Sequence, residues 1–302
     1  MSKAKTQIDK GQVQSFLGER LSPIEPSLEP IADGEISQAF FFNSAEGERV
    51  LRINSWEKVG FLKDAYAADH FSSIPVPVPK ILEVGEVSEG IFFAISERAL
   101  GKTLDKFSKE ETEEMIPLII KVLDTIHATP PAGEGYGPWD IDGKGKKTSW
   151  HEFLVSAQGQ PDDYLMEAVD FFEPALHQAL NTEIHTFIPY CPEERRLVHA
   201  DFGFNNVISD GTRITGVIDW EQSMYGDPLY DIAWLEFWGA EHGYEEIFRK
   251  HYSSQGRLPV NYHERVTCYK LNIGHGALCF FAKSEQPEKY NTAKQILSRV
   301  KR

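Results

Sequence analysis

The stretch 197–220 constrains the fold of this 302-residue chain more than any other part of its sequence. Two runs rich in Val and Ile, 207–208 and 214–218, flank a short polar segment that contains Asp210-Gly211. An Asp-Gly pair between two β-rich runs is a strong signal for a β-hairpin, because both residues tolerate the positive φ angles of a tight turn. We therefore expect a hairpin here, and the residues around it decide what the chain can bind.

Polar side chains collect at the open end of the expected hairpin. With a turn centred on the Asp-Gly pair, Asn206 lies opposite Thr215. The same register brings Asp219 alongside Asp201. Mg²⁺ takes a few carboxylate and amide oxygens and keeps water and phosphate as its other ligands, so the two carboxylates and the amide predict a Mg-nucleotide site. The alternative is a solvated loop of Asp and Asn residues that bounds a surface hairpin.

Length and composition are those of a soluble globular protein with room for two lobes, since 41% of the residues are hydrophobic and 25% are charged. No run of about eighteen apolar residues occurs, so we expect no membrane partner. The segment from Met1 to Thr6 precedes no apolar stretch, which argues against a signal peptide. Cys191, Cys268 and Cys279 are too few and too widely spaced for a disulfide framework or a zinc motif, which predicts a cytoplasmic protein.

The formal net charge is −15. A surface that binds nucleic acid needs clustered Lys and Arg, so we expect no nucleic-acid partner. A negative protein attracts cationic small molecules in a salt-dependent way. The same charge can equally serve solubility, and charge alone does not decide between these two interpretations.

The order of the expected elements predicts an α+β protein with two lobes. We place an N-terminal lobe of strands with one large helix at 1–97, a connector at 98–102 and a helical lobe at 103–302. Helices are expected at 9–21, 57–73, 149–157, 163–187, 243–255, 261–283 and 286–300, with two more starting at the capping box Ser108-x-x-Glu111 and at Asp227-Pro228. The Gly- and Pro-rich segment 129–147 is expected to be a long binding loop or lid.

The pattern His199-x-Asp201-x-x-x-x-Asn206, followed by Asp219, resembles the catalytic core of the protein-kinase-like superfamily. From about residue 31 to about residue 240 the chain resembles the aminoglycoside phosphotransferase family, and its hygromycin B phosphotransferase branch in particular. The segments that carry this resemblance are 50–55, 71–85, 135–138 and 224–227. The resemblance implies a bilobal protein-kinase-like fold, with an N-terminal antiparallel sheet lobe and a largely helical C-terminal lobe. Trp220 stands where protein kinases have Phe, which favours the antibiotic kinases.

By this resemblance, Asp201 is the catalytic base and touches the attacking hydroxyl, while Asn206 and Asp219 hold Mg²⁺ against the phosphates of ATP. His199 and Asp231 are expected to shape the loop rather than to react. The nucleotide contacts implied by the family are Gly34, Ser37, Arg52, Glu97 and Ala99.

Arg52 departs from the family pattern, because kinases have a Lys at this position that pairs with a Glu on a helix. Arg can also bind phosphate with two donors. Its matching helix acid is Asp64, and the alternative to a functional pair is a surface ion pair of little energetic value.

The expected acceptor contacts are Asn205, beside the metal ligand, and Glu236 and Trp238 on the helix after the core; Trp238 is equally compatible with a core position. The resemblance predicts an ATP-dependent O-phosphotransferase that acts as a monomer on a cationic aminoglycoside, hygromycin B first. Two alternatives stay open: a kinase of the same fold acting on a macrolide, choline, homoserine or a fructosamine, and a catalytically silent nucleotide-binding protein.

Overall fold

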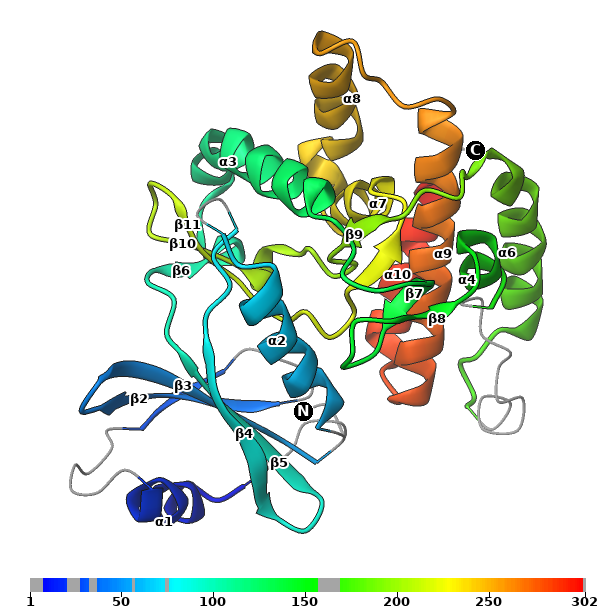
Figure 1. Cartoon of the computed structure of the whole chain (residues 1–302). Helices are drawn as coiled ribbons and strands as arrows, with labels where there is room; N and C mark the ends of the chain where they lie inside the picture. Colours follow the sequence, from blue (N-terminus) through cyan, green and yellow to red (C-terminus); the bar gives the residue numbers. More distant parts are fainter. Residues whose placement is uncertain are drawn as a thin grey trace. The chain divides into compact units, whose positions relative to one another are not determined.

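The computed structural model describes residues 8–20, 28–32, 37–55, 58–73, 76–156 and 169–300. Internal contacts divide the described residues into two compact units (Figure 1). Unit 1 takes its residues from Met1–Lys106 and Asn206–Glu221, and unit 2 takes its residues from Phe107–Asn205 and Gln222–Arg302. The predicted bounds differ from these units in two places. Residues 98–106, which we expected to form the connector and the start of the helical lobe, belong to unit 1. The hairpin after Asn206, which we expected in the second lobe, also belongs to unit 1.

Unit 1 is built around an antiparallel sheet with the strand order β1-β2-β3-β5-β4. Its elements are α1 (Lys10–Arg20), β1 (Glu29–Ile31), β2 (Gln38–Ser44), β3 (Gly47–Asn54), α2 (Val59–His70), β4 (Ile81–Ser88), β5 (Ile91–Glu97), β6 (Lys102–Thr103), η1 (Leu104–Lys106), β10 (Val207–Ser209) and β11 (Ile214–Val217). This is the predicted pattern of strands with one large helix, and the short N-terminal helix is confirmed as well.

Alternation along β3 decides which side chains face α2. Leu51 and Ile53 are fully buried in a cluster that includes Phe16 of α1. Because successive side chains of a strand point to opposite faces of the sheet, Arg52 points away from that cluster. It meets Asp64, which is buried on α2. The two-residue period of the strand therefore places the guanidinium of Arg52 on the side of the sheet that faces α2.

The hairpin forms as predicted, but its register is different. The pairs are Val207 with Val217 and Ile208 with Gly216, followed by a bulge, so the loop runs over 210–213 instead of turning on two residues. The reason is the Asp210 carboxylate, which accepts hydrogen bonds from the backbone N–H groups of Thr212 and Arg213 and closes a longer turn. The predicted pairing of Asn206 with Thr215 was therefore wrong. β10 also pairs with β6, which attaches the hairpin to unit 1.

Unit 2 is mainly helical, with one small sheet of strand order β8-β7-β12-β9. Its elements are α3 (Lys109–Ala128), β7 (Tyr136–Trp139), β8 (Gly145–Lys147), α4 (Trp150–Ser156), α6 (Pro174–Phe187), η2 (Ile188–Tyr190), β9 (Arg196–Val198), η3 (Phe204–Asn206, whose last residue belongs to unit 1), β12 (Met224–Gly226), α7 (Leu229–Trp238), η4 (Ala240–His242), α8 (Tyr244–Ser254), α9 (Tyr262–Lys283) and α10 (Pro287–Arg299). The long helix α9 is the centre of this unit, because it contacts α6, α7 and α10.

Local sequence signals located most of the helices of unit 2. The capping box is confirmed, since Ser108 and Glu111 exchange side-chain-to-backbone hydrogen bonds of 2.7 and 3.2 Å. The segment 129–147 was expected to be a loop and instead contains the hairpin β7–β8, whose strand β7 pairs with β12. In the described part of the range 163–187, the expected helix begins at Pro174. Proline is favoured at the first position of a helix, where its missing N–H has no partner to lose.

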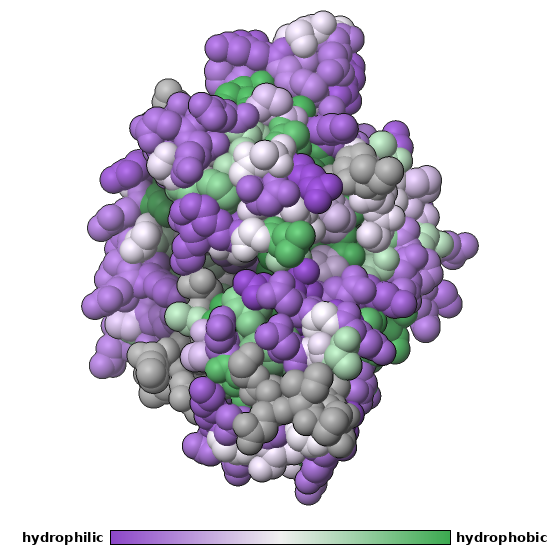
Figure 2. Space-filling view, turned by 90° about the vertical axis from the view of Figure 1, so that its left-hand side faces the viewer, coloured by the Kyte–Doolittle hydropathy of each residue, from purple (hydrophilic) through white to green (hydrophobic). Residues whose placement is uncertain are grey.

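Polar side chains dominate the face of the molecule shown in Figure 2, and hydrophobic side chains show there as small separate patches. Within the described ranges, none of the helices combines the length and the apolar character that crossing a membrane requires. The cysteines Cys191, Cys268 and Cys279 are free thiols.

Candidate active site

The loop that carries Asp201 follows β9 in unit 2 and is held by one carboxylate of α7. Asp231 is fully buried, and its Oδ1 accepts the backbone N–H of Ala200 at 2.7 Å. Its Oδ2 accepts the backbone N–H of His199 at 3.0 Å. Ala200 has a φ of 63°, a left-handed conformation that costs a residue with a side chain about 1–2 kcal/mol. The two bonds to Asp231 fix this unfavourable backbone, which confirms the expectation that Asp231 shapes the loop.

His127 completes this brace from the last turn of α3. Its Nε2 lies 2.9 Å from Oδ2 of Asp231, and its side chain is buried. His199 is fully buried beside Phe202, with ring centroids 5.7 Å apart in an edge-to-face arrangement. The contacts of Asp231 hold the backbone up to Ala200, the residue before Asp201. The side chain of Asp201 is half-buried, and its carbonyl accepts the N–H of Gly203 at 2.8 Å.

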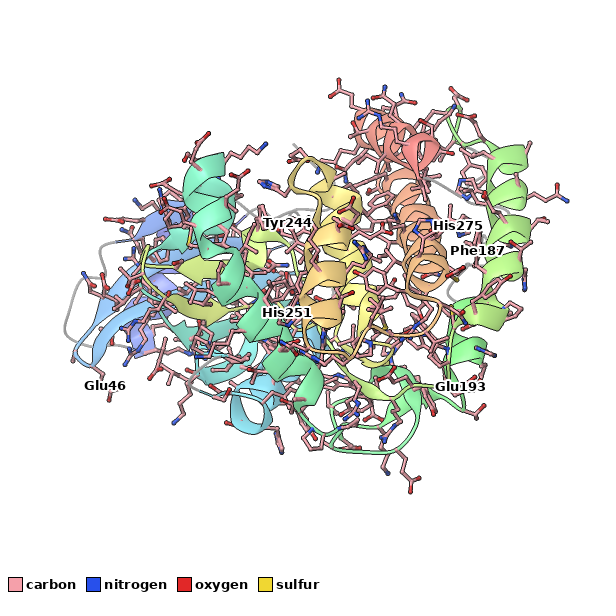
Figure 3. All side chains as sticks on the ribbon, turned by 90° about the horizontal axis from the view of Figure 1, so that it is seen from above. Glu46, Phe187, Glu193, Tyr244, His251 and His275 are labelled. Carbon is pink, nitrogen blue, oxygen red and sulfur yellow. The ribbon has the colours of Figure 1, made fainter. Side chains whose placement is uncertain are left out.

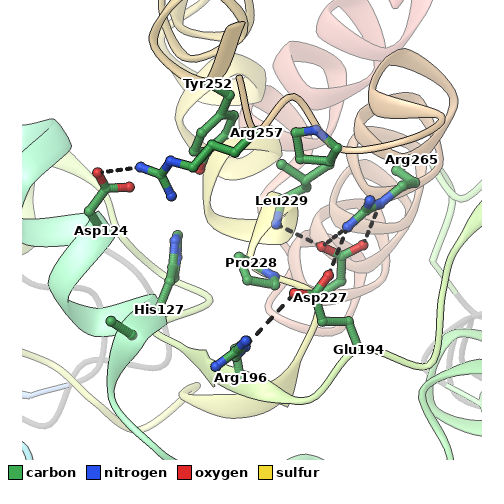
Figure 4. Close-up of a pocket in the computed structure, with 12 residues that line it drawn as sticks. Asp124, His127, Glu194, Arg196, Asp227, Pro228, Leu229, Tyr252, Arg257 and Arg265 are labelled. Carbon is green, nitrogen blue, oxygen red and sulfur yellow. Dashed lines mark hydrogen bonds and ion pairs between the residues drawn. The ribbon is translucent and has the colours of Figure 1, made fainter. Parts of the chain in front are cut away.

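A polar cavity of about 300 Å³ adjoins His127 in unit 2 (Figure 4). Its charged side chains pair with one another: Arg257 donates to Asp124 at 2.8 Å, and Arg265 donates to both carboxylate oxygens of Asp227 at 2.7 and 2.8 Å. Arg265 also reaches Glu194 at 3.2 Å. These pairs compensate the opposite charges that line the cavity.

The predicted metal ligands Asn206 and Asp219 lie together at the open end of the hairpin in unit 1. The N–H of Ile218 donates to the carbonyl of Asn206 at 2.9 Å, so Asp219 follows directly after the residue paired with Asn206. This is closer than the predicted register allowed. Asp219 has a φ of 64°, the left-handed conformation. Such strained residues concentrate where a side chain must be aimed at a ligand.

Asp64 links this end of the hairpin to α2 and to Arg52. Its Oδ1 accepts the backbone N–H of Trp220 at 2.7 Å, and its Oδ2 forms an ion pair with Arg52. Burial opposes the charge of Arg52, but the carboxylates of Asp64 and Asp219 outweigh it and raise the pKa of the guanidinium. The ion pair is half-buried and joins two elements, so the alternative of an incidental surface pair does not hold.

The electrostatics around Asp219 fit a divalent cation. Burial, and then the negative charge of Asp64, raise the pKa of Asp219 above its ordinary value, although Arg52 acts in the opposite direction. Two carboxylates at one place disfavour each other's ionised form, whereas a bound cation favours it. The carboxylate of Asp219 and the amide oxygen of Asn206 form a donor set that suits Mg²⁺, because this ion binds few protein oxygens and keeps water and phosphate as its other ligands.

The expected nucleotide contacts that the structure describes all belong to unit 1. Ser37 is half-buried just before β2, and Gly34 lies outside the described residues. Glu97 ends β5 with an exposed side chain, and its N–H donates to the carbonyl of Lys80 at 2.9 Å. No described residue donates to or accepts from the backbone of Ala99. The connector can therefore offer the backbone groups of Ala99 to a base.

The expected acceptor contacts in unit 2 behave differently from one another. Asn205 is exposed, and Trp238 keeps 37% of its surface exposed while its ring packs edge-to-face on Phe237 at 4.8 Å. Glu236 instead accepts the backbone N–H of Glu245 at 2.9 Å and so caps the start of α8. Burial raises the pKa of Glu236. Its role in contacting a substrate stays a prediction, and the structure gives it a scaffold role that the sequence did not suggest.

His127 is a supporting residue that sequence reasoning missed. It occupies the last turn of an amphipathic helix, on the side that also buries Leu123 and Ile126. A polar residue on the apolar face of a helix needs a buried partner, and this was the available signal.

Comparisons with known proteins agree with these observations. The sequence profile of the phosphotransferase enzyme family matches residues 27–263. The chain is 37% identical over 237 residues to hygromycin-B 4-O-kinase of Escherichia coli, covering 78% of this chain and 68% of that protein. A solved structure of a thermostable mutant of aminoglycoside phosphotransferase APH(4)-Ia, in a ternary complex with ADP and hygromycin B, matches with a TM-score of 0.83 and 34% identity over 96% of this chain and 97% of that one. The GDP and kanamycin complex of APH(2")-IIia shares the fold, with a TM-score of 0.70 and 15% identity over 96% and 98% of the two chains.

Proposed function

Because the chain belongs to the phosphotransferase enzyme family and is an aminoglycoside phosphotransferase, we propose that it transfers the γ-phosphoryl group of ATP to a hydroxyl of hygromycin B. The relative from Escherichia coli is named for phosphorylation at O4, and we propose the same position here. The product would be a phosphorylated drug, and the biological effect would be resistance to it.

The observation that carries the proposal is the braced loop that presents Asp201. A base is useful only if its carboxylate is held where the acceptor hydroxyl arrives. Asp231 fixes the two residues before Asp201 with bonds of 2.7 and 3.0 Å. In the proposed reaction Asp201 orients the hydroxyl and accepts its proton as the oxygen attacks phosphorus.

Unit 1 supplies the residues proposed to hold the nucleotide. Asn206 and Asp219 would hold Mg²⁺, which supplies positive charge against the phosphate oxygens when it is bound. Arg52, oriented by Asp64, would donate to the same phosphates in place of the usual Lys. Phosphoryl transfer asks for positioning and charge compensation more than for a strong base, and this set of residues provides both.

The acceptor is proposed to meet Asn205 and the exposed ring of Trp238. The formal charge of −15 supports a cationic substrate, because it lowers the free energy of approach for ammonium groups. We further propose that the protein works as a cytoplasmic monomer. Its three free thiols support a reducing compartment.

Mass spectrometry of hygromycin B after incubation with the protein, ATP and Mg²⁺ tests the proposal. We expect one added phosphoryl group per drug molecule, and none with the Asp201→Ala variant or after chelation of Mg²⁺. The matched control Asp69→Ala changes an exposed Asp near the end of α2 and should retain turnover. Drug-dependent release of ADP with a macrolide, choline, homoserine or a fructosamine, but not with hygromycin B, would move the substrate assignment to that acceptor.

A silent nucleotide-binding protein makes a different prediction. It would gain thermal stability with Mg-ATP and yet release no ADP with any acceptor. A thermal-shift measurement beside the turnover assay therefore separates this alternative from the proposed enzyme.

A further inference from the structure

Two histidines and a cysteine meet inside the helical unit, outside the residues assigned to phosphoryl transfer. His177 lies on α6, and His275 and Cys279 lie one turn apart on α9 (Figure 3 labels His275). One ring nitrogen of each His and the Sγ of Cys279 lie within 4.8 Å of one another. Residues four apart on a helix share one face, so α9 offers two donors to the side on which it contacts α6.

The cluster is buried but incompletely satisfied. His177 and His275 keep only 4% and 2% of their surface exposed. Nδ1 of His275 is buried and has no hydrogen-bond partner among the described residues. A buried polar atom without a partner costs about 1–3 kcal/mol, so such an atom calls for an explanation. An apolar side chain at this position of α9 would avoid that cost entirely.

We propose that His177, His275 and Cys279 form a binding site for a transition-metal cation of the zinc class. Two imidazoles and a thiolate are donors that select Zn²⁺ and its chemical relatives over Mg²⁺ and Ca²⁺, which prefer oxygen. The site is therefore chemically separate from the oxygen donors Asn206 and Asp219.

The neighbouring groups already prepare His177 as a ligand. Its Nε2 lies 3.1 Å from the hydroxyl of Tyr290 on α10, and its Nδ1 lies 3.8 Å from Sγ of Cys279. When Nε2 carries the proton and donates it to Tyr290, the lone pair of Nδ1 points toward Cys279. A hydrogen bond from the far nitrogen of a ligating His is the usual way in which proteins fix its orientation.

The distances ask for a small contraction on binding. Donors around tetrahedral Zn²⁺ are about 3.4–3.8 Å apart, as follows from Zn–N and Zn–S bonds of about 2.1 and 2.3 Å. The donor atoms now lie up to 4.8 Å apart, so the distances between them would shorten by about 1 Å when the metal binds. Cys279 is half-buried, so its side of the cluster reaches solvent, and water can supply the fourth ligand.

Metal binding would join α6 to α9 and so stabilise the centre of the helical unit. Burial lowers the pKa of His275 and, together with the charge of its neighbour, that of His177, so both imidazoles are neutral at pH 7 as ligands must be. Burial raises the pKa of the Cys279 thiol to about 11. Binding must therefore displace the thiol proton into solvent.

Titration of the full-length protein, free of any polyhistidine tag and stripped of metal by a chelator, tests the site. Calorimetry with Zn²⁺ should give one site of micromolar or tighter affinity, with release of about one proton per ion at pH 7. Co²⁺ should give a thiolate-to-cobalt charge-transfer band in the near ultraviolet. The Cys279→Ser variant should lose this band and bind Zn²⁺ at least about tenfold more weakly.

The matched control is Cys268→Ser, which removes a buried thiol elsewhere on α9 and should keep both the band and the affinity. The absence of saturable Zn²⁺ binding, or equal affinity in Cys279→Ser, would overturn the proposal. If Cys279→Ser does not fold by circular dichroism, His275→Gln decides: a weaker Zn²⁺ affinity with an unchanged circular dichroism spectrum supports the site, and an unchanged affinity overturns it. Drug phosphorylation by folded Cys279→Ser should equal that of the parent, because no residue of the cluster takes part in transfer.

Discussion

Replacement of Asp231 by Asn tests whether the buried carboxylate holds the loop in its working conformation. The side chain keeps its shape, but one of the two acceptor oxygens becomes a donor, so one of the N–H groups of His199 and Ala200 loses its partner. A hydrogen bond to a charged acceptor contributes about 1.5–3 kcal/mol. Relaxation of the left-handed Ala200 recovers about 1 kcal/mol of strain, so the net loss of unfolding free energy should be about 0.5–2 kcal/mol.

The effect on turnover should be larger than the effect on stability. Once Ala200 relaxes, Asp201 moves with it, and a displacement of about 1 Å at a reacting group typically lowers the rate about 100-fold. We expect kcat for hygromycin B to fall by about that factor, while KM for ATP changes little, because the proposed nucleotide contacts belong to unit 1. Steady-state kinetics by coupled ADP release, together with urea denaturation, measure both quantities.

Asp124→Asn is the matched control for this prediction. It makes the same chemical change on α3, at a half-buried carboxylate that pairs with Arg257 and His251 and not with the loop. Its kcat should stay within about twofold of the parent and its stability within about 1 kcal/mol. An unchanged kcat in Asp231→Asn, or an equal loss in Asp124→Asn, would refute the bracing argument.

Three further predictions concern other parts of the molecule. Arg52→Met should raise KM for ATP about 10–100-fold, since one or two charge-assisted bonds are lost, and Arg52→Lys should recover part of it; kinetics at varied ATP show whether the guanidinium contacts phosphate. Trp238→Ala should raise KM for hygromycin B about fivefold and lower Tm modestly, because the ring is 37% exposed and otherwise packs on Phe237; an unchanged KM removes it from the acceptor site. In chelator-treated protein, stability should decline as pH falls from 6.5 toward 4, because burial lowers the pKa of His177 and His275 to about 4 and the unfolded chain takes up protons first. At pH 5 the loss of unfolding free energy is about 2 kcal/mol per imidazole. Equal free energies of unfolding at pH 7 and pH 5, measured by urea denaturation, would refute this prediction.

The features that the sequence predicted well depend on residues close together in the chain. The capping box joins Ser108 to Glu111 within a single turn of helix, so the spacing of the two residues in the sequence already predicts their contact. The hairpin was predicted because its strands are adjacent, but its register was not. The carboxylate of Asp210 closes a four-residue loop, and the Asp-Gly signal for a two-residue turn does not include that side-chain preference.

The short strands β7 and β12 show why the remainder of the fold was missed. Gly137 of β7 pairs with Tyr225 of β12, 88 positions further along the chain. The extended conformation of β7 therefore depends on this distant partner and not on the composition of β7 alone. Tertiary contacts of this kind leave no periodic pattern in three or four residues.

The candidate site divides in the same way. Asp201, Asn206 and Asp219 lie in one continuous stretch, so their spacing could be read directly. The contacts that hold them are long-range: Asp64 reaches Trp220 across 156 residues, and His127 reaches Asp231 across 104. Neither His127 nor the capping role of Glu236 belongs to a recognisable spacing, because both depend on which helices become neighbours.

The discontinuity of unit 1 has a consequence for biosynthesis. A ribosome that has completed Lys106 has supplied the whole β1–β5 sheet, but neither Asn206 nor Asp219. At about 5–20 residues per second, the hairpin is translated roughly 5–20 s later, after much of the helical unit has been made. Until then the N–H of Trp220 that Asp64 accepts in the finished protein does not yet exist. The nascent sheet therefore acquires Asn206 and Asp219, the residues proposed to hold the cation of the nucleotide, only after the helical unit has been partly translated.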